Sequence, residues 1–182
     1  GLIKKNKIIS ILEKNKKQIL NKNFNIIQTI CYESLKTKLY FFIKDEKEKK
    51  ERLNLNFGHT FAHAIEMALN SNKKKDFIQH GEAVGFGMLC EIYYTNLKKN
   101  DLYFKIKKIL EDYSISMNLN DYMPKDFRKN KLHKDIFLNI FLDKKKIGIH
   151  PRYISLRTLY KPNISVIDDM TKLNQTIFNL IN

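Results

Sequence analysis

Three of the five histidines lie close together in this chain, in a stretch that also holds two carboxylates. His59 and His63 are four residues apart, a spacing that places both imidazoles on one face of a helix and that metal sites use. His80 follows across a polar loop, so two helix starts can bring it to the same ion. Zn²⁺ suits imidazole and carboxylate ligands and leaves a position for water or substrate oxygens. The sequence therefore predicts a metal site, and spacing alone favours His59 and His63 as the ligand pair.

Other interpretations of this region stay open at this point. Histidine pairs at a spacing of four are also found at ordinary polar or capping positions. Glu66 and Glu82 are either partners that orient one of the histidines, or carboxylates of a first helical turn and the surface. The remaining histidines, His133 and His150, stand among lysines or beside a proline with no partner in sequence, and we interpret them as surface residues.

The elements that must position these residues are mostly helices, in one domain. Apolar residues recur at helical spacing along most of the chain, and residues 153–159 alternate as in a strand, with 164–166 as a short partner. Gly85 and Gly87 are interpreted as close-packing positions between helices. The predicted helices cover residues 8–20, 25–42, 58–70, 80 onward, 102–117, 132–142 and 171–181.

Composition and charge narrow the class of protein. A hydrophobic content of 43% with 12% aromatic residues is typical of a folded chain. The net charge of +15 is spread over separate elements, which favours solvated lysine faces over a nucleic-acid site. Cys31 and Cys90 are predicted to be buried free thiols in a reducing compartment. No apolar run approaches the roughly 20 residues that span a bilayer, so we expect no membrane partner and a cytoplasmic location.

Two segments carry a resemblance to a known family. The run Arg52-x3-Asn56-x-Gly58-His59-Thr60-x2-His63-Ala64-x-Glu66, followed by His80-Gly81-Glu82-Ala83-Val84-x2-Gly87-Met88, resembles the signature of the 3-dehydroquinate synthases, which are sugar-phosphate cyclases. Flanking segments agree in order and spacing: Lys38 with Asp45-Glu46, Asp143-Lys144-Lys145 with Arg152, and residues 164–169. Ala62 departs from the pattern, because the family usually has glycine there.

The resemblance implies a fold and a domain organisation. Residues 1–182 resemble the C-terminal, metal- and substrate-binding domain of the dehydroquinate synthase-like fold, mainly α with a small β-hairpin or strand pair near 152–167. In the family an N-terminal domain binds NAD, and a Glu-x-x-Lys segment after it supplies a further zinc ligand. The opening residues resemble those just after that segment, and no glycine-rich phosphate loop occurs in these 182 residues. We therefore expect the NAD-binding domain to be absent and this piece to be inactive alone.

The resemblance also reassigns the histidines. It makes His59 and His80 the zinc ligands, with cobalt as an alternative metal, and moves His63 to the substrate as an assistant in proton transfer. It assigns the substrate carboxylate to the guanidinium of Arg52 and the ammonium of Lys38. It places Asn56, His63 and a lysine of residues 143–146 near the phosphate. The substrate-binding residues implied are Lys38, Arg52, Asn56, His63 and Lys145, the last favoured over Lys144.

The implied activity is that of a carbon-oxygen lyase of the shikimate pathway, which leads to chorismate and the aromatic amino acids. In the family, NAD oxidises 3-deoxy-arabino-heptulosonate 7-phosphate, phosphate is eliminated, the hydride returns, and ring opening and aldol closure give 3-dehydroquinate. The family further suggests a homodimer and a sugar-acid phosphate as partner. Two alternatives remain: a cyclase for a non-carboxylated sugar phosphate, which Lys38 and Arg52 argue against, and a non-catalytic basic helical module that binds nucleic acid.

Overall fold

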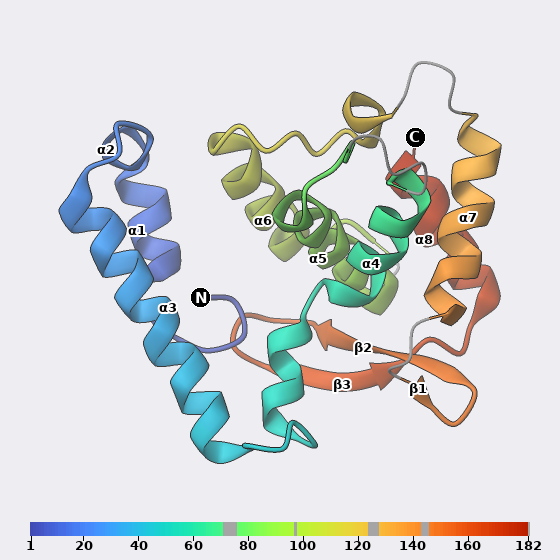
Figure 1. Ribbon diagram of the computed structural model, residues 1–182, viewed down its shortest axis with the longest axis horizontal. Helices are drawn as coiled ribbons and strands as arrows, with labels where there is room; N and C mark the ends of the chain where they lie inside the picture. The colour runs from blue at the N-terminus through green and yellow to red at the C-terminus, as the bar shows by residue number, and fades with distance from the viewer. Residues whose placement is uncertain (71–75, 97, 124–127, 143–145, 182) are drawn as a thin grey trace.

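The fold, seen in a computed structural model, is mainly helical with one small sheet (Figure 1). Residues 1–182 are described except for 71–75, 97, 124–127, 143–145 and 182. The mainly α prediction, with a strand pair near 152–167, is confirmed. The helices are α1 (Ile8–Lys14), α2 (Lys16–Leu20), α3 (Phe24–Lys44), α4 (His59–Leu69), α5 (His80–Asn96), α6 (Asp101–Asp112), α7 (Lys129–Leu142) and α8 (Met170–Ile181), with 3-10 turns η1 (Glu51–Asn56) and η2 (Leu119–Tyr122).

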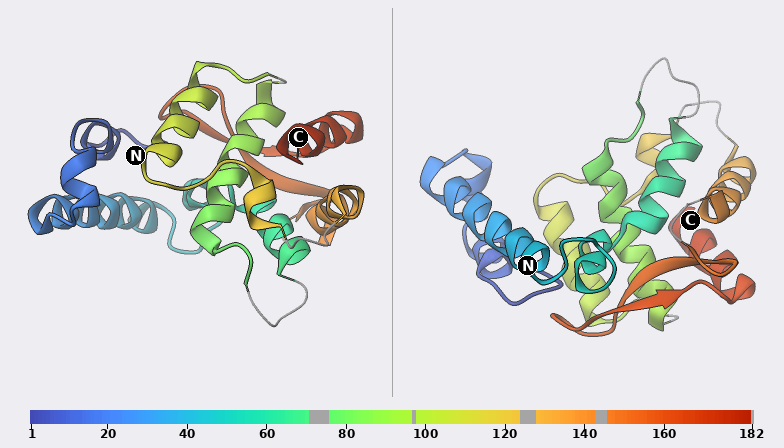
Figure 2. Two further views of the ribbon diagram at one scale, coloured as in Figure 1. Left: turned by 90° about the horizontal axis from the view of Figure 1, so that it is seen from above. Right: turned by 60° about the horizontal axis from the view of Figure 1, so that its bottom comes forward.

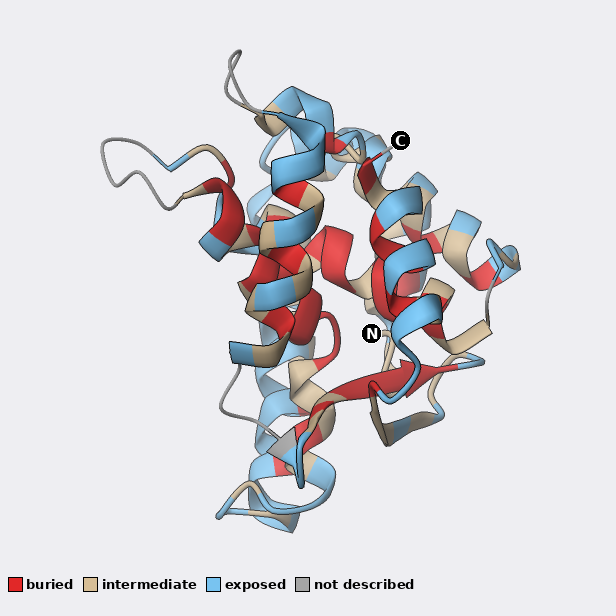
Figure 3. Cartoon of the chain, turned by 90° about the vertical axis from the view of Figure 1, so that its right-hand side faces the viewer, coloured by how far each residue is buried: buried red, intermediate tan, exposed pale blue. Residues whose placement is uncertain are grey.

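The core lies between α4, α5, α7 and α8, with α6 packed on the other side of α5. Phe61 and Ile65 on α4 are fully buried, as are Ile136 on α7 and Ile177 on α8. Figure 3 shows buried residues gathered where these helices face one another and along the sheet. Helices α1–α3 form a separate arm beside this core, as both views of Figure 2 show. The arm continues through η1 into α4.

Helices α4 and α5 approach closely where two glycines meet. Gly58, the residue before α4, has φ +87, a left-handed conformation that glycine adopts without strain. A Cβ built on Gly87 of α5 would lie 1.8 Å from the carbonyl oxygen of Gly58. The expectation that Gly87 permits close packing is therefore confirmed. Gly85 also lies in contact range of α6, since its built Cβ would meet Leu110 at 3.4 Å.

The sheet has strand order β1-β2-β3, with β1 (Lys146–Ile147), β2 (His150–Leu156) and β3 (Pro162–Val166). Both pairings are antiparallel, and Tyr153 of β2 faces Ser165 of β3. The strand pair was predicted, whereas β1 was not. Its two residues are too few to show an alternating pattern.

Two helix boundaries differ from the predictions. The pattern over 8–20 is split at Asn15, whose side-chain amide donates to the Ile11 carbonyl at 3.2 Å and ends α1. Helix α6 ends at Asp112 rather than near Met117. Ser114 there has φ +62, and the Ile115 N–H donates to the Leu110 carbonyl, the hydrogen bond of a Schellman-type helix end.

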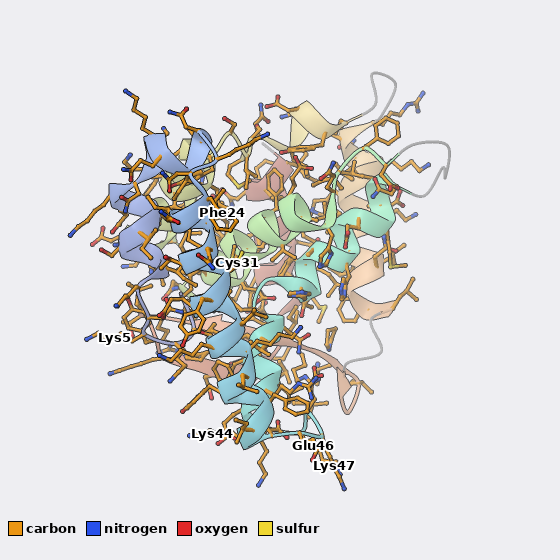
Figure 4. The ribbon with its side chains drawn as sticks, turned by 60° about the vertical axis from the view of Figure 1, so that its left-hand side comes forward. Lys5, Phe24, Cys31, Lys44, Glu46 and Lys47 are labelled. Carbon is orange, nitrogen blue, oxygen red and sulfur yellow. The ribbon has the colours of Figure 1, made fainter. Side chains whose placement is uncertain are left out.

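Of the two thiols predicted to be buried, the prediction is confirmed for Cys90 and wrong for Cys31. Cys90 is buried, and burial raises the pKa of its thiol above the usual range. Cys31 is exposed on α3, the helix in front in Figure 4. Helix α3 buries only Thr37 and Phe41, whereas Leu35 is 66% exposed. Part of its apolar pattern therefore lies on a face that is exposed in the described part of the chain. Among the described helices, none is long and apolar enough to cross a membrane.

The contact between Gly58 and Gly87 makes a stability prediction. Gly87→Ala forces a methyl group against the Gly58 backbone, and we expect it to lower the free energy of unfolding by about 1–3 kcal/mol or more. Gly81→Ala is the control, because a Cβ at Gly81 meets nothing within 4 Å. It should stay within about 1 kcal/mol of wild type. Urea denaturation measures both, and equal behaviour of the two variants would contradict the packing argument.

Candidate metal and substrate site

Three imidazoles meet at the starts of α4 and α5. His59 is the first residue of α4, His63 lies one turn further, and His80 is the first residue of α5. The ring centroids are 5.3 Å apart for His59 and His80, 5.7 Å for His59 and His63, and 6.2 Å for His63 and His80. Imidazoles that share one zinc ion at ~2.1 Å have ring centres roughly 5 Å apart, so the spacing of His59 and His80 fits a common ion.

The surroundings orient two of these rings. His80 Nδ1 lies 3.2 Å from both carboxylate oxygens of Glu66, and His59 Nδ1 lies 3.4 Å from the Phe57 carbonyl. A ring nitrogen that donates to an oxygen leaves the other nitrogen to bind a metal, and such oxygens are usual partners of ligand histidines. Among the described residues, no group of three His, Cys, Asp or Glu side chains is assembled as a complete metal site. The described residues thus offer a histidine pair whose spacing fits zinc, without a complete ligand set.

The two carboxylates whose roles were left open have different functions. Glu66 contacts His80, as described above, and is the orienting partner. Glu82 instead accepts the backbone N–H of Gln79 at 2.8 Å and lies 3.3 Å from the Tyr122 hydroxyl. It therefore caps the first turn of α5, where the helix dipole also favours a negative charge.

A cleft of about 470 Å³ opens beside His59 between α3 and η1. Its lining includes Lys38 from α3 and Arg52 and Asn56 from η1, so one cleft joins three residues predicted to bind substrate with one predicted to bind metal. His63 does not line this cleft. It lies in a narrow pocket next to it, shared with Asn56, His59 and Arg152.

The position of Lys145 is not tested, because residues 143–145 lie outside the described part. The other six predicted site residues lie in one contiguous region; they are Lys38, Arg52, Asn56, His59, His63 and His80. His59 is common to the cleft, the narrow pocket and the ring contact with His80.

A tight turn after α3 holds Arg52. The Asp45 carboxylate accepts the backbone N–H groups of Lys49, Lys50 and Arg52, and these hydrogen bonds, that from Lys49 first, lower the pKa of Asp45 below its usual range. Arg52 Nη1 donates to the Glu46 carbonyl at 2.6 Å. Its guanidinium carbon lies 5.0 Å from the centre of the Phe42 ring. The turn therefore holds both the backbone and the guanidinium of Arg52 in place at the cleft.

Glu48 adds a carboxylate to the same cleft. It accepts from the Asn56 amide at 2.9 Å, and its other oxygen lies 3.9 Å from Arg52 Nε. It therefore connects the two η1 side chains predicted to bind substrate. The pattern around the histidines did not single it out, because the surrounding lysines and glutamates look alike in sequence.

Glu91 is a second residue at the site that the sequence analysis missed. It lies on α5, is fully buried, and accepts the backbone N–H of Gly58 at 2.9 Å, directly before His59. Its other oxygen has no hydrogen-bond partner among the described residues. Burial raises the pKa of Glu91 well above its usual range, against the opposing effect of nearby N–H groups, that of Gly58 first. The signal in the sequence was a charged residue four positions after Gly87, on the same helix face.

The sequence also matches a family of known proteins. The sequence family described as 3-dehydroquinate synthase C-terminal matches residues 1–146. The 3-dehydroquinate synthase of Dictyoglomus thermophilum is 38% identical over 164 residues, which is 90% of this chain and 43% of that protein. That of Clostridium tetani is 30% identical over 186 residues, covering 100% of this chain and 46% of the relative. The chain thus spans less than half the length of these relatives.

Glu91 gives a prediction about pH. A carboxyl group whose pKa is raised by folding favours the folded state below its unfolded pKa of about 4.3, and this contribution is lost as the pH rises towards the folded pKa. We expect the free energy of unfolding of the wild type to fall relative to Glu91→Gln between about pH 4 and pH 7. Glu33→Gln on α3 is the control and should show no such trend. Urea denaturation across this range measures the difference, and a constant difference would contradict a neutral, buried Glu91.

Proposed function

Because the chain belongs to the 3-dehydroquinate synthase family, we propose that it forms the metal- and substrate-binding part of an enzyme that converts 3-deoxy-arabino-heptulosonate 7-phosphate into 3-dehydroquinate and phosphate. The observation that carries this proposal is the single cleft that joins Lys38, Arg52, Asn56 and His59. In this proposal residues 1–182 are the C-terminal domain, and NAD is bound by a separate domain. A cytoplasmic homodimer belongs to the same proposal.

Lys38 and Arg52 bind the substrate carboxylate in this scheme. A guanidinium can hold a carboxylate through two parallel hydrogen bonds, and an ammonium adds a point charge. The turn around Asp45 supports this role because it fixes the backbone of Arg52 through a hydrogen bond at 3.2 Å. A cyclase for a substrate without a carboxylate has no need of this pair, so the cleft favours the sugar acid.

His59 and His80 hold zinc, with cobalt as an alternative, and further ligands come from outside this pair. The ion, when bound, supplies a Lewis acid for the alcohol that NAD oxidises. Glu66 supports the assignment of His80, because a carboxylate on Nδ1 fixes the ring and raises the basicity of the other nitrogen.

His63 assists proton transfer near the phosphate of the substrate, together with Asn56 and Lys145 as phosphate-binding groups. The narrow pocket that His63 shares with Asn56 supports this, since it places an imidazole beside a predicted phosphate contact and one helical turn from the metal ligand His59. An imidazole can take up a proton on one ring nitrogen and return it, which suits this role.

The metal assignment predicts different results for the three histidines. His59→Ala or His80→Ala should weaken zinc binding about 100-fold or more, because each removes a ligand, and Glu66→Gln about 10-fold. His63→Ala should leave zinc affinity nearly unchanged, as should the control His133→Ala. Zinc titration by calorimetry, with cobalt absorption spectra as a second readout, measures the affinities. Loss of metal in His63→Ala would overturn the division of roles.

The substrate assignment is tested in a chimera in which this chain replaces the matching region of the Dictyoglomus thermophilum enzyme. Arg52→Gln should lower kcat/KM roughly 10- to 100-fold, since hydrogen bonds to charged groups contribute ~1.5–3 kcal/mol. Lys36→Gln on the same helix as Lys38 is the control and should retain activity. An active chimera whose kcat/KM is insensitive to Arg52→Gln would contradict carboxylate binding at this position. A chimera with no activity, although folded and zinc-loaded, would contradict the proposed reaction.

A further inference from the structure

A second hollow, of about 450 Å³, lies over the β2–β3 hairpin. It is bounded by the hairpin, the last turn of α5 and the first turn of α8, and its described lining shares no residue with that of the substrate cleft. Thr95 in its wall is 15 residues beyond His80 on α5, which corresponds to ~22 Å along a helix. The hollow is therefore separate from the substrate cleft, although Tyr153 also lines the narrow pocket that holds His63.

The floor of the hollow is a group of hydroxyl side chains. Ser155 of β2 and Ser165 of β3 lie 2.9 Å apart through their Oγ atoms, and the Tyr153 hydroxyl is hydrogen bonded to Thr95 and Ser165. Tyr153 and Ser155 are buried. Burial, the largest cause, raises the pKa of Tyr153, so its hydroxyl keeps the proton and can donate it in a hydrogen bond.

Among the described residues that line the hollow, three are cations and none is a carboxylate. Arg157 and Lys161 come from the loop that joins β2 to β3, and Lys172 comes from α8. In the described residues, none of the three forms an ion pair, and the Lys172 ammonium lies 4.7 Å from the centre of the Tyr94 ring. Asp168 is outside the lining, although its charge contributes slightly to the raised pKa of Tyr153. The rim is therefore positive above a floor of hydroxyls.

We propose that this hollow binds a small phosphate monoester, with the phosphoryl group between Arg157, Lys161 and Lys172 and the polar part of the ester on the hydroxyl floor. Three cations without carboxylates match a dianion, and hydroxyls both donate to and accept from the hydroxyls of an ester. The volume supports an ester over free phosphate, because it lies in the range of small-molecule sites, ~300–1,000 Å³. The three cations that would hold the phosphoryl group are not among the residues assigned to metal or substrate.

The test uses ribose 5-phosphate and inorganic phosphate as probes at constant ionic strength. Calorimetry gives the affinities, and the amide NMR signals of Ser155 and Ser165 report where each probe binds. We expect saturable binding of ribose 5-phosphate that shifts both signals and is about 10-fold tighter than that of inorganic phosphate. Arg157→Gln with Lys161→Gln should weaken it about 10-fold or more. Ser155→Ala, a smaller change, should weaken it while the protein stays folded.

Two controls separate this site from general attraction to a basic protein. Lys14→Gln with Lys17→Gln removes two exposed charges elsewhere and should leave the affinity unchanged. Asn56→Ala with His63→Ala removes two groups assigned to the substrate phosphate and should also leave it unchanged, whatever the outcome of the zinc and activity experiments. Equal affinity for both probes, no shift at Ser155 and Ser165, or equal weakening by either control would overturn the proposal.

Discussion

The close approach of α4 and α5 at Gly58 and Gly87 is the constraint on which the site depends. It places the first turns of two helices side by side, and each of these turns carries a histidine. Glu91 completes the junction from within α5, because it accepts the N–H of Gly58 where the chain enters α4. A side chain larger than hydrogen at either glycine would separate the helices and with them His59 and His80.

The arm of α1–α3 brings the second part of the site. Helix α3 and the turn after it carry Lys38 and Arg52 to the cleft beside His59. The turn is held by three backbone N–H groups on one carboxylate, that of Asp45. The groups proposed to bind metal and carboxylate thus come from different parts of the fold, a helical core and an arm, which meet at η1 and the start of α4.

The sequence predicted the helices and the strand pair because their apolar spacing is clear, and it predicted the histidine region because its residue types are rare in this chain. Spacing alone favoured His59 with His63, and the resemblance favoured His59 with His80. The structure brings all three rings within 6.2 Å or less of one another, so the choice between the pairs stays a prediction. Glu91 was missed because its partner is a backbone N–H 33 positions away in sequence. Cys31 was misplaced because an apolar helical pattern does not say which face finds a partner.

The central claim is that His59 and His80, and not His63, hold the metal. Anomalous diffraction at the zinc edge from crystals of the zinc-loaded protein tests it most directly. The account predicts one zinc peak at about 2.1 Å from a ring nitrogen of His59 and one of His80, with Glu66 on the other nitrogen of His80 and His63 outside the coordination sphere. A zinc ion held by His59 and His63, with His80 turned away, would contradict it.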